Sequence, residues 1–128
     1  MATTPGGGLL EEELTGAIIG AAMEVHRALG PGFLESVYRR AFEEEMSARG
    51  MCFEREKPLE VRYRGVQVGC FQADFLVARR VIVELKAAKG LSEVDEAQVI
   101  NYLKASGIRV GLLFNFGERS LAYRRFVV

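Results

Sequence analysis

Hydrophobic residues recur at intervals of three and four along the first fifty positions of the chain, which places them on one face of an α-helix. The first such segment runs from about Leu10 to Leu29 and stops at Gly30-Pro31-Gly32. The second runs from about Phe33 to Arg49, with Gly50 as its end. The two apolar stripes are Leu14, Ala17, Ile18, Ala21, Ala22, Val25 and Leu29, followed by Leu34, Val37, Tyr38, Ala41, Phe42 and Met46. We expect two amphipathic helices that bury these stripes.

The middle of the chain changes to a pattern typical of β-strands. Residues 53–63 and 66–77 are rich in β-forming side chains and are joined by Arg64-Gly65. Residues 81–86 predict a third strand. These three segments are close enough in sequence to form antiparallel hairpins.

The last third of the chain predicts a helix and two more strands. Ser92 is placed to cap a helix that ends near Ser106. Residues 110–116 form a continuous apolar run typical of a buried strand, and residues 121–128 predict an edge strand. The order of elements predicts an α/β fold in which helices flank a mixed sheet of three antiparallel core strands and a further strand after a helix. At 128 residues and 49% hydrophobic composition, we expect one domain at 10–128 after a small-residue tail at 1–9.

The register of the second hairpin follows from its polar residues. With Ala78-Arg79-Arg80 as the loop, the opposed pairs are Val77 and Val81, Phe75 and Val83, and Asp74 and Glu84. One face then carries Phe75, Val77, Val81, Val83 and Leu85, and the other carries Gln72, Asp74, Glu84 and Lys86. A two-residue loop would pair Asp74 with Leu85 and scatter the polar residues over both faces. The three-residue loop is therefore favoured.

Asp74, Glu84 and Lys86 have the layout of a metal-dependent site that cleaves phosphodiesters. Side chains alternate along a strand, so Glu84 and Lys86 project from the same face, about 7 Å apart. Mg²⁺ prefers oxygen ligands, and a neighbouring lysine can position a water or neutralise charge on a phosphate. The alternative is that the carboxylates are solvated positions on a half-exposed sheet, with Lys86 as a surface ion partner.

Charge restricts how this chain could bind nucleic acid. Its formal net charge is zero, so binding would have to use a local basic patch rather than the overall field. The candidate cations are Arg79, Arg80, Lys86, Lys89, Lys104, Arg124 and Arg125. The alternative is that these are ordinary solubilising charges.

Cys52 and Cys70 are isolated, without CxxC spacing. This predicts buried or half-buried thiols of a reduced intracellular protein, not a zinc site or a disulfide framework. The apolar stretch at residues 17–23 is too short to span a bilayer. We expect a cytoplasmic protein without a membrane partner.

Several ordered motifs resemble a known family. Residues 32–38 read Gly-Phe-Leu-Glu-Ser-Val-Tyr and match the GxxExxY signature of a small bacterial family placed in the PD-(D/E)xK nuclease superfamily. The other matching segments are Val25-His26-Arg27, Phe71-Gln72-Ala73-Asp74-Phe75, Val83-Glu84-Leu85-Lys86-Ala87, Ala97-Gln98 and Asn101-Tyr102-Leu103-Lys104. The resemblance covers nearly everything from Ile18 to Phe116. It implies a restriction-endonuclease-like sandwich.

The resemblance also implies roles for individual residues. Asp74 and Glu84 would be the metal-binding carboxylates, with the carbonyl of Leu85 as a further ligand, and Lys86 would be the catalytic lysine. The cofactor would be Mg²⁺ or Mn²⁺. None of these positions is substituted, so the resemblance favours an enzyme.

Two further site residues follow from the resemblance, and each has an alternative. Glu35 resembles the additional acidic residue beside the metal, but it could instead form an i,i+4 ion pair with Arg39. Gln98 resembles the polar residue contributed by the helix after the core strands. It lies one turn before Tyr102, which suits either a site wall or a helix packing contact.

Tyr38 and His26 have roles that the sequence leaves open. Tyr38 lies on the apolar stripe of its helix, which favours a core position with the hydroxyl at the rim over a direct role. His26 is the only histidine of the chain. A histidine near a helix end is more often a hydrogen-bonded structural residue than a general base.

The function favoured by these observations is metal-dependent hydrolysis of DNA or RNA, with the choice between the two, and between endonuclease and exonuclease, left open. The alternative is a protein of the same fold that does not cleave by itself, either a self-assembling protein or a nucleic-acid-binding subunit. Self-association would use the N-terminal tail or an apolar sheet edge formed by residues 114–116 and 126–128. The counter-interpretation is that these residues complete the domain's own core.

Overall fold

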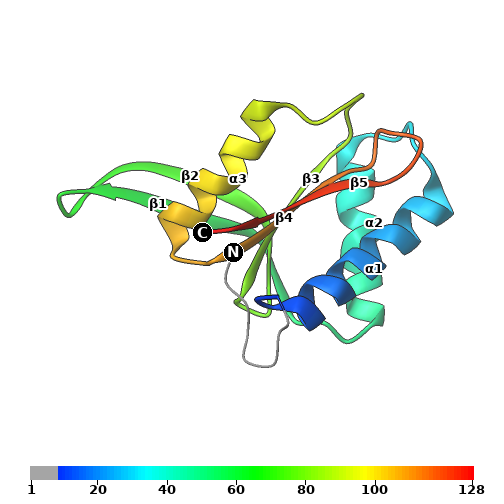
Figure 1. Ribbon diagram of the computed structural model, residues 1–128, viewed down its shortest axis with the longest axis horizontal. Coiled ribbons are helices and arrows are strands. Elements are labelled where there is room, and N and C mark those ends of the chain that lie inside the picture. Colours follow the sequence, from blue (N-terminus) through cyan, green and yellow to red (C-terminus); the bar gives the residue numbers. More distant parts are fainter. Residues whose placement is uncertain (1–8) are drawn as a thin grey trace.

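Three helices and five strands follow one another in the computed structural model, which describes residues 9–128 (Figure 1). They are α1 (Glu12–Leu29), α2 (Glu35–Ala48), β1 (Phe53–Tyr63), β2 (Val66–Val77), β3 (Val81–Lys86), α3 (Glu93–Ser106), β4 (Val110–Asn115) and β5 (Ala122–Val127). The predicted order of elements is confirmed. The predicted tail lies, apart from Leu9, outside the described residues.

The strands form one sheet in the order β1-β2-β3-β4-β5. Neighbouring strands are antiparallel except β3 and β4, which are parallel and are connected through α3. A parallel pair needs such a crossover, so the mixed sheet follows from the single helix between these strands. Figure 1 shows α1 and α2 on one side of the sheet, α3 on the other, and the β1–β2 hairpin projecting beyond the helices.

The predicted three-residue loop between β2 and β3 is confirmed. Phe75 pairs with Val83 and Val77 pairs with Val81. Ala78 and Arg79 in the loop have φ angles of 52° and 59°, in the left-handed region that side chains adopt mainly in tight turns.

The two faces of the sheet carry separate hydrophobic cores. The core under α1 and α2 contains the buried residues Ile18, Ala21, Ala22, Val25, Tyr38, Phe42, Met46, Phe75, Val77, Val81, Val83, Leu85, Val110, Leu112, Phe114 and Phe116. The core under α3 is smaller and contains Leu59, Ala73, Leu76, Ile82, Val99, Tyr102, Leu103 and Leu113. Because β4 is buried along its whole length, its continuous apolar run contributes to both faces, as predicted.

Tyr38 fixes the turn between the first two helices. It is fully buried, and its ring stacks on Phe116 at a centroid distance of 4.8 Å. Its hydroxyl donates to the carbonyl of Gly30 at 2.5 Å and accepts from the N–H of Phe33 at 3.2 Å. These bonds connect the end of α1 to the start of α2, so the core position expected for Tyr38 is confirmed.

The two apolar segments of the C-terminal part, residues 114–116 and 126–128, are buried to different extents. Phe114 and Phe116 are fully buried, because they pack against Phe42 and Tyr38 of α2. Phe126 and Val127 on the edge strand β5 are half-buried. Residues 114 and 116 therefore complete the domain's own core, whereas self-association through residues 126–128, of which Val128 is 46% exposed, stays a prediction.

The burial predicted for the two cysteines is wrong. Cys52 and Cys70 are both exposed. Cys70 lies on the projecting hairpin, which α1 and α2 do not cover.

His26 is buried, and its Nε2 atom lies 2.9 Å from the carbonyl oxygen of Glu118, in agreement with the structural role. Among residues 9–128, no helix combines the length and apolar character that crossing a bilayer requires.

Candidate active site

The carboxyl groups of Asp74 and Glu84 meet where the pairing of β2 with β3 stops. The paired residues run from Val77 and Val81 to Phe75 and Val83. Beyond them, an oxygen of Glu84 accepts from the backbone N–H of Asp74 at 3.0 Å. An oxygen of Asp74 accepts from the backbone N–H of Leu85 at 2.8 Å. The two acidic side chains thus take the place of strand-to-strand hydrogen bonds.

Alternation along β2 breaks at Asp74. The ring of Phe71 contacts Tyr102 of α3, and Ala73 belongs to the α3-side core. Phe75, two residues later, belongs to the opposite core. Gln72, Asp74, Glu84 and Lys86 were predicted to share one face of the sheet. This prediction is wrong for Gln72, which lies beyond the break at Asp74.

The neighbouring strand is distorted at the same level. Arg55 and Lys57 of β1 pair with Phe75 and Ala73, and Glu56 between them has a φ angle of 51°. This left-handed residue marks a local twist of the β1–β2 ribbon. It lies at the same level as the point where the pairing of β2 with β3 stops.

Burial makes this carboxyl pair electrostatically unfavourable. Glu84 is only 4% exposed, and the side chain of Asp74 is 18% exposed. Loss of solvation, followed by the hydrogen bond and charge of Asp74, raises the pKa of Glu84 to about 9. Glu84 therefore retains its proton at neutral pH when no cation is present. A bound cation would remove this cost.

Lys86 and Gln98 lie beside the carboxyl pair. Lys86, at the end of β3, donates from Nζ to Oε1 of Gln98 on α3 at 3.2 Å. The positive charge of Lys86 acts to lower the pKa of Glu84, although burial outweighs it. Tyr102, one turn after Gln98, is 4% exposed and has a raised pKa through burial and the nearby Glu84 and Asp74. Tyr102 therefore serves both as core and as the wall of this site.

Glu35 approaches the site through an arginine. It is the first residue of α2, and its carboxylate accepts from Arg39 at 2.5 Å, one turn later. The same nitrogen of Arg39 lies 3.7 Å from Asp74. The i,i+4 pair considered as an alternative is present, and it also joins Glu35 to Asp74. Sequence reasoning did not foresee Arg39 as a member of the site.

Asn115 is a second residue that sequence reasoning missed. It is fully buried at the end of β4, in register with Lys86. Its side chain bonds both the N–H and the carbonyl of Ala88, at 2.9 and 3.0 Å, and also contacts Gly117 and Glu118. Asn115 therefore holds the chain that follows Lys86. The available signal was a lone amide within an apolar run.

The oxygens at this site suit a hard divalent cation. Within residues 9–128, no three His, Cys, Asp or Glu side chains gather as ready metal ligands. Asp74 and Glu84 supply two carboxyl groups, while Glu35 is held by Arg39. Mg²⁺ binds commonly through one or two carboxylates and keeps several waters. The residues present fit such an ion.

Comparison with known proteins identifies the superfamily of the chain. Residues 12–126 match the PD-(D/E)XK nuclease superfamily. The chain belongs to this superfamily. The match covers α1 through most of β5, so the whole α/β domain described above is the nuclease superfamily's domain. No curated protein matches the chain in sequence at a significant level.

A solved structure supports the same fold. The crystal structure of SSO0001 matches with a TM-score of 0.54 and 15% sequence identity, over 72% of this chain and 48% of that one. The chain thus spans about half the length of that protein. At this identity the similarity concerns the fold, a restriction-endonuclease-like α/β sandwich, and the superfamily generally uses divalent metals and nucleic acid substrates.

Proposed function

We propose that this protein is a cytoplasmic nuclease of the GxxExxY family that hydrolyses phosphodiester bonds of DNA or RNA with Mg²⁺ or Mn²⁺. The observation that supports this most strongly is the buried pair of Asp74 and Glu84, followed two residues later by Lys86. Isolated acidic residues on a solvated surface would not produce such a pair, because each would stay hydrated and charged. The solvated-sheet alternative is therefore disfavoured.

Asp74, Glu84 and the carbonyl of Leu85 would hold the metal. The N–H of Leu85 points toward Asp74, as their 2.8 Å hydrogen bond requires. In a strand, the N–H and C=O of one residue face the same neighbouring strand. The carbonyl of Leu85 therefore faces the gap that β2 leaves, whereas the carbonyl of Lys86 faces β4 and accepts from Phe116. This direction supports the proposal that the Leu85 carbonyl is a third oxygen ligand.

Lys86 would act on the reacting phosphate and water. A bound Mg²⁺ or Mn²⁺ would polarise the phosphate and lower the pKa of a nearby water. Lys86 would orient the attacking water and stabilise the negative charge that develops on the phosphate oxygens. Gln98 holds Lys86 by the 3.2 Å hydrogen bond to Nζ, which limits the directions that the ammonium group adopts.

Glu35 and Arg39 would adjust the charge at the edge of the site. Arg39 lies between two carboxylates and partly neutralises Asp74. A cation bound at Asp74 would compete with Arg39 for the same carboxylate. Release of Arg39 would then leave Glu35 able to contact the metal's water shell.

The direct test is a cleavage assay with single- and double-stranded DNA and RNA, each with Mg²⁺, with Mn²⁺ and with chelator. We expect metal-dependent cleavage by the native chain and none by Lys86→Ala. Lys89→Ala is the matched control, because Lys89 is an exposed lysine three residues later, beyond the strand. It should retain turnover.

Absence of cleavage under every condition would contradict the proposed activity. Large particles in light scattering that grow with protein concentration would then support self-assembly. Salt-sensitive binding of DNA or RNA without hydrolysis would instead support a subunit that needs a partner to cleave.

A further inference from the structure

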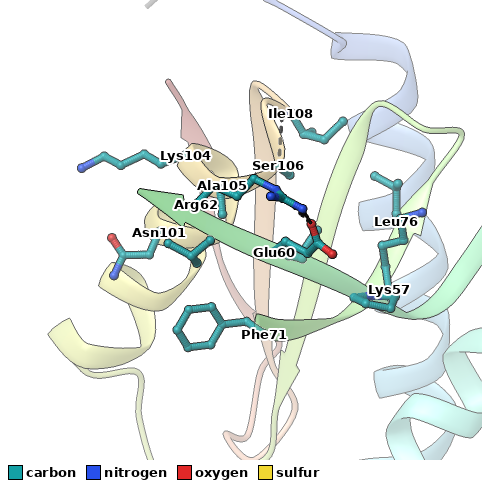
Figure 2. A pocket seen from close by; sticks show the side chains of 13 residues that line it. Lys57, Glu60, Arg62, Phe71, Leu76, Asn101, Lys104, Ala105, Ser106 and Ile108 are labelled. Atoms are coloured by element: carbon teal, nitrogen blue, oxygen red, sulfur yellow. Dashed lines mark hydrogen bonds and ion pairs between the residues drawn. The ribbon is translucent and has the colours of Figure 1, made fainter. Parts of the chain in front are cut away.

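A groove runs between the β1–β2 hairpin and the C-terminal half of α3. It has a volume of about 830 Å³ and does not include Asp74 or Glu84. Figure 2 shows Lys57 and Leu76 at one end of this groove and Lys104 of α3 at the other. Because the hairpin projects beyond the helices, the groove is open to solvent along β1.

The groove lies next to the candidate active site. Lys57, which lines it, pairs in the sheet with Ala73, the residue before Asp74. Phe71, also in its lining, contacts the ring of Tyr102 at a centroid distance of 5.7 Å. Tyr102 in turn borders the carboxyl pair, which contributes to its raised pKa. One end of a chain molecule lying in the groove would therefore be only a few residues from Asp74.

The lining combines an apolar floor with cations. Phe71 is 47% exposed and lines the groove, as do Leu76 and Ile108. The cations of the lining are Lys57, Arg62 and Lys104, and its acidic residue is Glu60. Lys57 also pairs with Glu54, outside the lining, at 3.3 Å between exposed side chains. The ion pair of Glu60 with Arg62, at 2.8 Å, is exposed and therefore weak enough for a phosphate to compete. Among residues 9–128, Lys104 makes no ion pair shorter than 4.0 Å.

We propose that this groove binds an unpaired stretch of DNA or RNA and guides it to the carboxyl pair. The proposal rests on the proposed nuclease function and specifies the form of its substrate. Bases of a single strand can stack on the exposed face of Phe71, while Lys57, Arg62 and Lys104 contact the phosphates. A duplex keeps its base faces stacked inside and would leave the apolar floor without a partner.

The length of the groove agrees with this occupant. Lys57 and Arg62 are five residues apart on β1, which corresponds to roughly 16 Å of strand. This is enough for a few nucleotides of a single strand.

The test is fluorescence anisotropy with a labelled oligonucleotide, as a single strand and as a duplex of the same sequence, in chelator so that no cleavage occurs. Phe71→Ala should weaken single-strand binding about tenfold, the effect of losing one base stacked on an aromatic ring. Lys104→Gln should lower the slope of log affinity against log salt by about 0.7, the value for one lost phosphate contact on a single strand.

Matched controls lie outside the groove. Tyr63→Ala removes an aromatic ring that is 64% exposed on the same hairpin but absent from the groove lining. Arg40→Gln removes an exposed cation on α2, which lies on the opposite side of the sheet from α3 (Figure 1). Both variants should bind the single strand as the native chain does. Circular dichroism of each variant excludes a folding defect.

The outcomes separate this proposal from the nuclease function. Unchanged single-strand binding by both Phe71→Ala and Lys104→Gln would overturn the groove proposal, as would an equal loss for the duplex. A groove that instead binds a labelled acidic peptide, and no single strand, would also overturn it. Cleavage by the native chain with no effect of these variants would leave the nuclease function intact. Single-strand binding sensitive to Phe71, without cleavage by the native chain, would support the groove and refute the nuclease function.

Discussion

On the side of the sheet that faces α1 and α2, β3 contributes Val83 and Leu85 to a core of aromatic and branched side chains. On the side that faces α3, the same strand contributes Glu84 and Lys86 to a site with a buried acidic side chain. Adjacent residues of one strand thus serve opposite purposes. The first face excludes water and stabilises the fold, whereas the second accepts an unfavourable arrangement that a cation can relieve.

This difference shows how a small domain can hold a strained site. A buried carboxyl pair lowers stability unless the remaining contacts compensate for it. The aromatic rings on the α1 and α2 side form a continuous set of contacts, from Phe53 through Phe75, Phe42 and Phe114 to Phe116. We infer that the stability of the domain comes mainly from this face.

The largest effect on stability should come from a substitution in the core under α1 and α2. Phe42 is fully buried, with ring centroids 5.4 Å from Phe75 and 6.1 Å from Phe114. Phe42→Ala should lower the free energy of unfolding by about 3–5 kcal/mol, measured by urea denaturation, because it leaves a cavity. Phe71→Ala on the other face should cost less than about 1 kcal/mol, since that ring is half in solvent. Similar losses in the two variants would contradict the proposed division between the faces.

Asp74 tests whether the carboxyl pair is strained. Asp74→Asn should abolish cleavage, yet leave the metal-free free energy of unfolding unchanged or raised. The amide oxygen can still accept from the N–H of Leu85, and the variant no longer holds a charge at this largely buried position. Asp74→Ala should instead cost about 1–3 kcal/mol, because the N–H of Leu85 loses its partner. If Asn destabilises as much as Ala does, the charge of Asp74 is structural.

The raised pKa of Glu84 predicts a pH dependence of metal-free stability. In the folded chain Glu84 keeps its proton up to about pH 9, whereas its ordinary pKa is 4.5. The folded state therefore binds more protons between these values. The contribution of Glu84 to the free energy of unfolding is complete below about pH 4.5. It is lost as the pH rises toward 9, by up to about 1.4 kcal/mol per pH unit.

Glu84→Gln is the matched variant for this effect, because it cannot titrate. The difference in the free energy of unfolding between native and variant chains, measured by urea denaturation from pH 5 to 9 in chelator, should fall with that slope. With Mg²⁺ the native chain should gain more from the metal at higher pH, since binding displaces the proton. A difference that does not vary with pH would show that Glu84 is already ionised at pH 5.

The fold could be predicted in large part because its signals are periodic. Helical spacing located α1 and α2, and the polar residues of β2 and β3 selected the three-residue loop, since any slip would move Glu84 into the apolar core. The switch of faces at Asp74 could not be predicted. It accompanies a local twist, marked by the left-handed Glu56. The alternation of apolar and polar residues along a strand does not indicate where such a twist occurs. The exposure of Cys70 was also missed, because it depends on where the covering helices end.

The members of the candidate site that lie within strands could be predicted from the sequence. Asp74, Glu84 and Lys86 lie together because of register, and Gln98 joins them through the helix that follows. Arg39 could not be placed, because its contact with Asp74 depends on the angle at which α2 crosses the sheet. That angle is set by packing between distant segments rather than by local sequence.

Substitution of Arg39 should have the smallest effect on free energies. It tests the contact between α2, which covers one face of the sheet, and the carboxyl pair on the other. The ion pair of Arg39 with Glu35 is half-exposed, and Arg39 lies 3.7 Å from Asp74, so its removal should change free energies by less than about 1 kcal/mol. Arg39→Gln should tighten Mg²⁺ binding by up to about fivefold in isothermal titration calorimetry, because a cation that competes for Asp74 is lost. Arg40→Gln is the control, since Arg40 pairs with Glu44 at 2.6 Å, away from the carboxyl pair. Weaker binding in Arg39→Gln alone would mean that Arg39 orients Asp74 for the metal instead of competing with it.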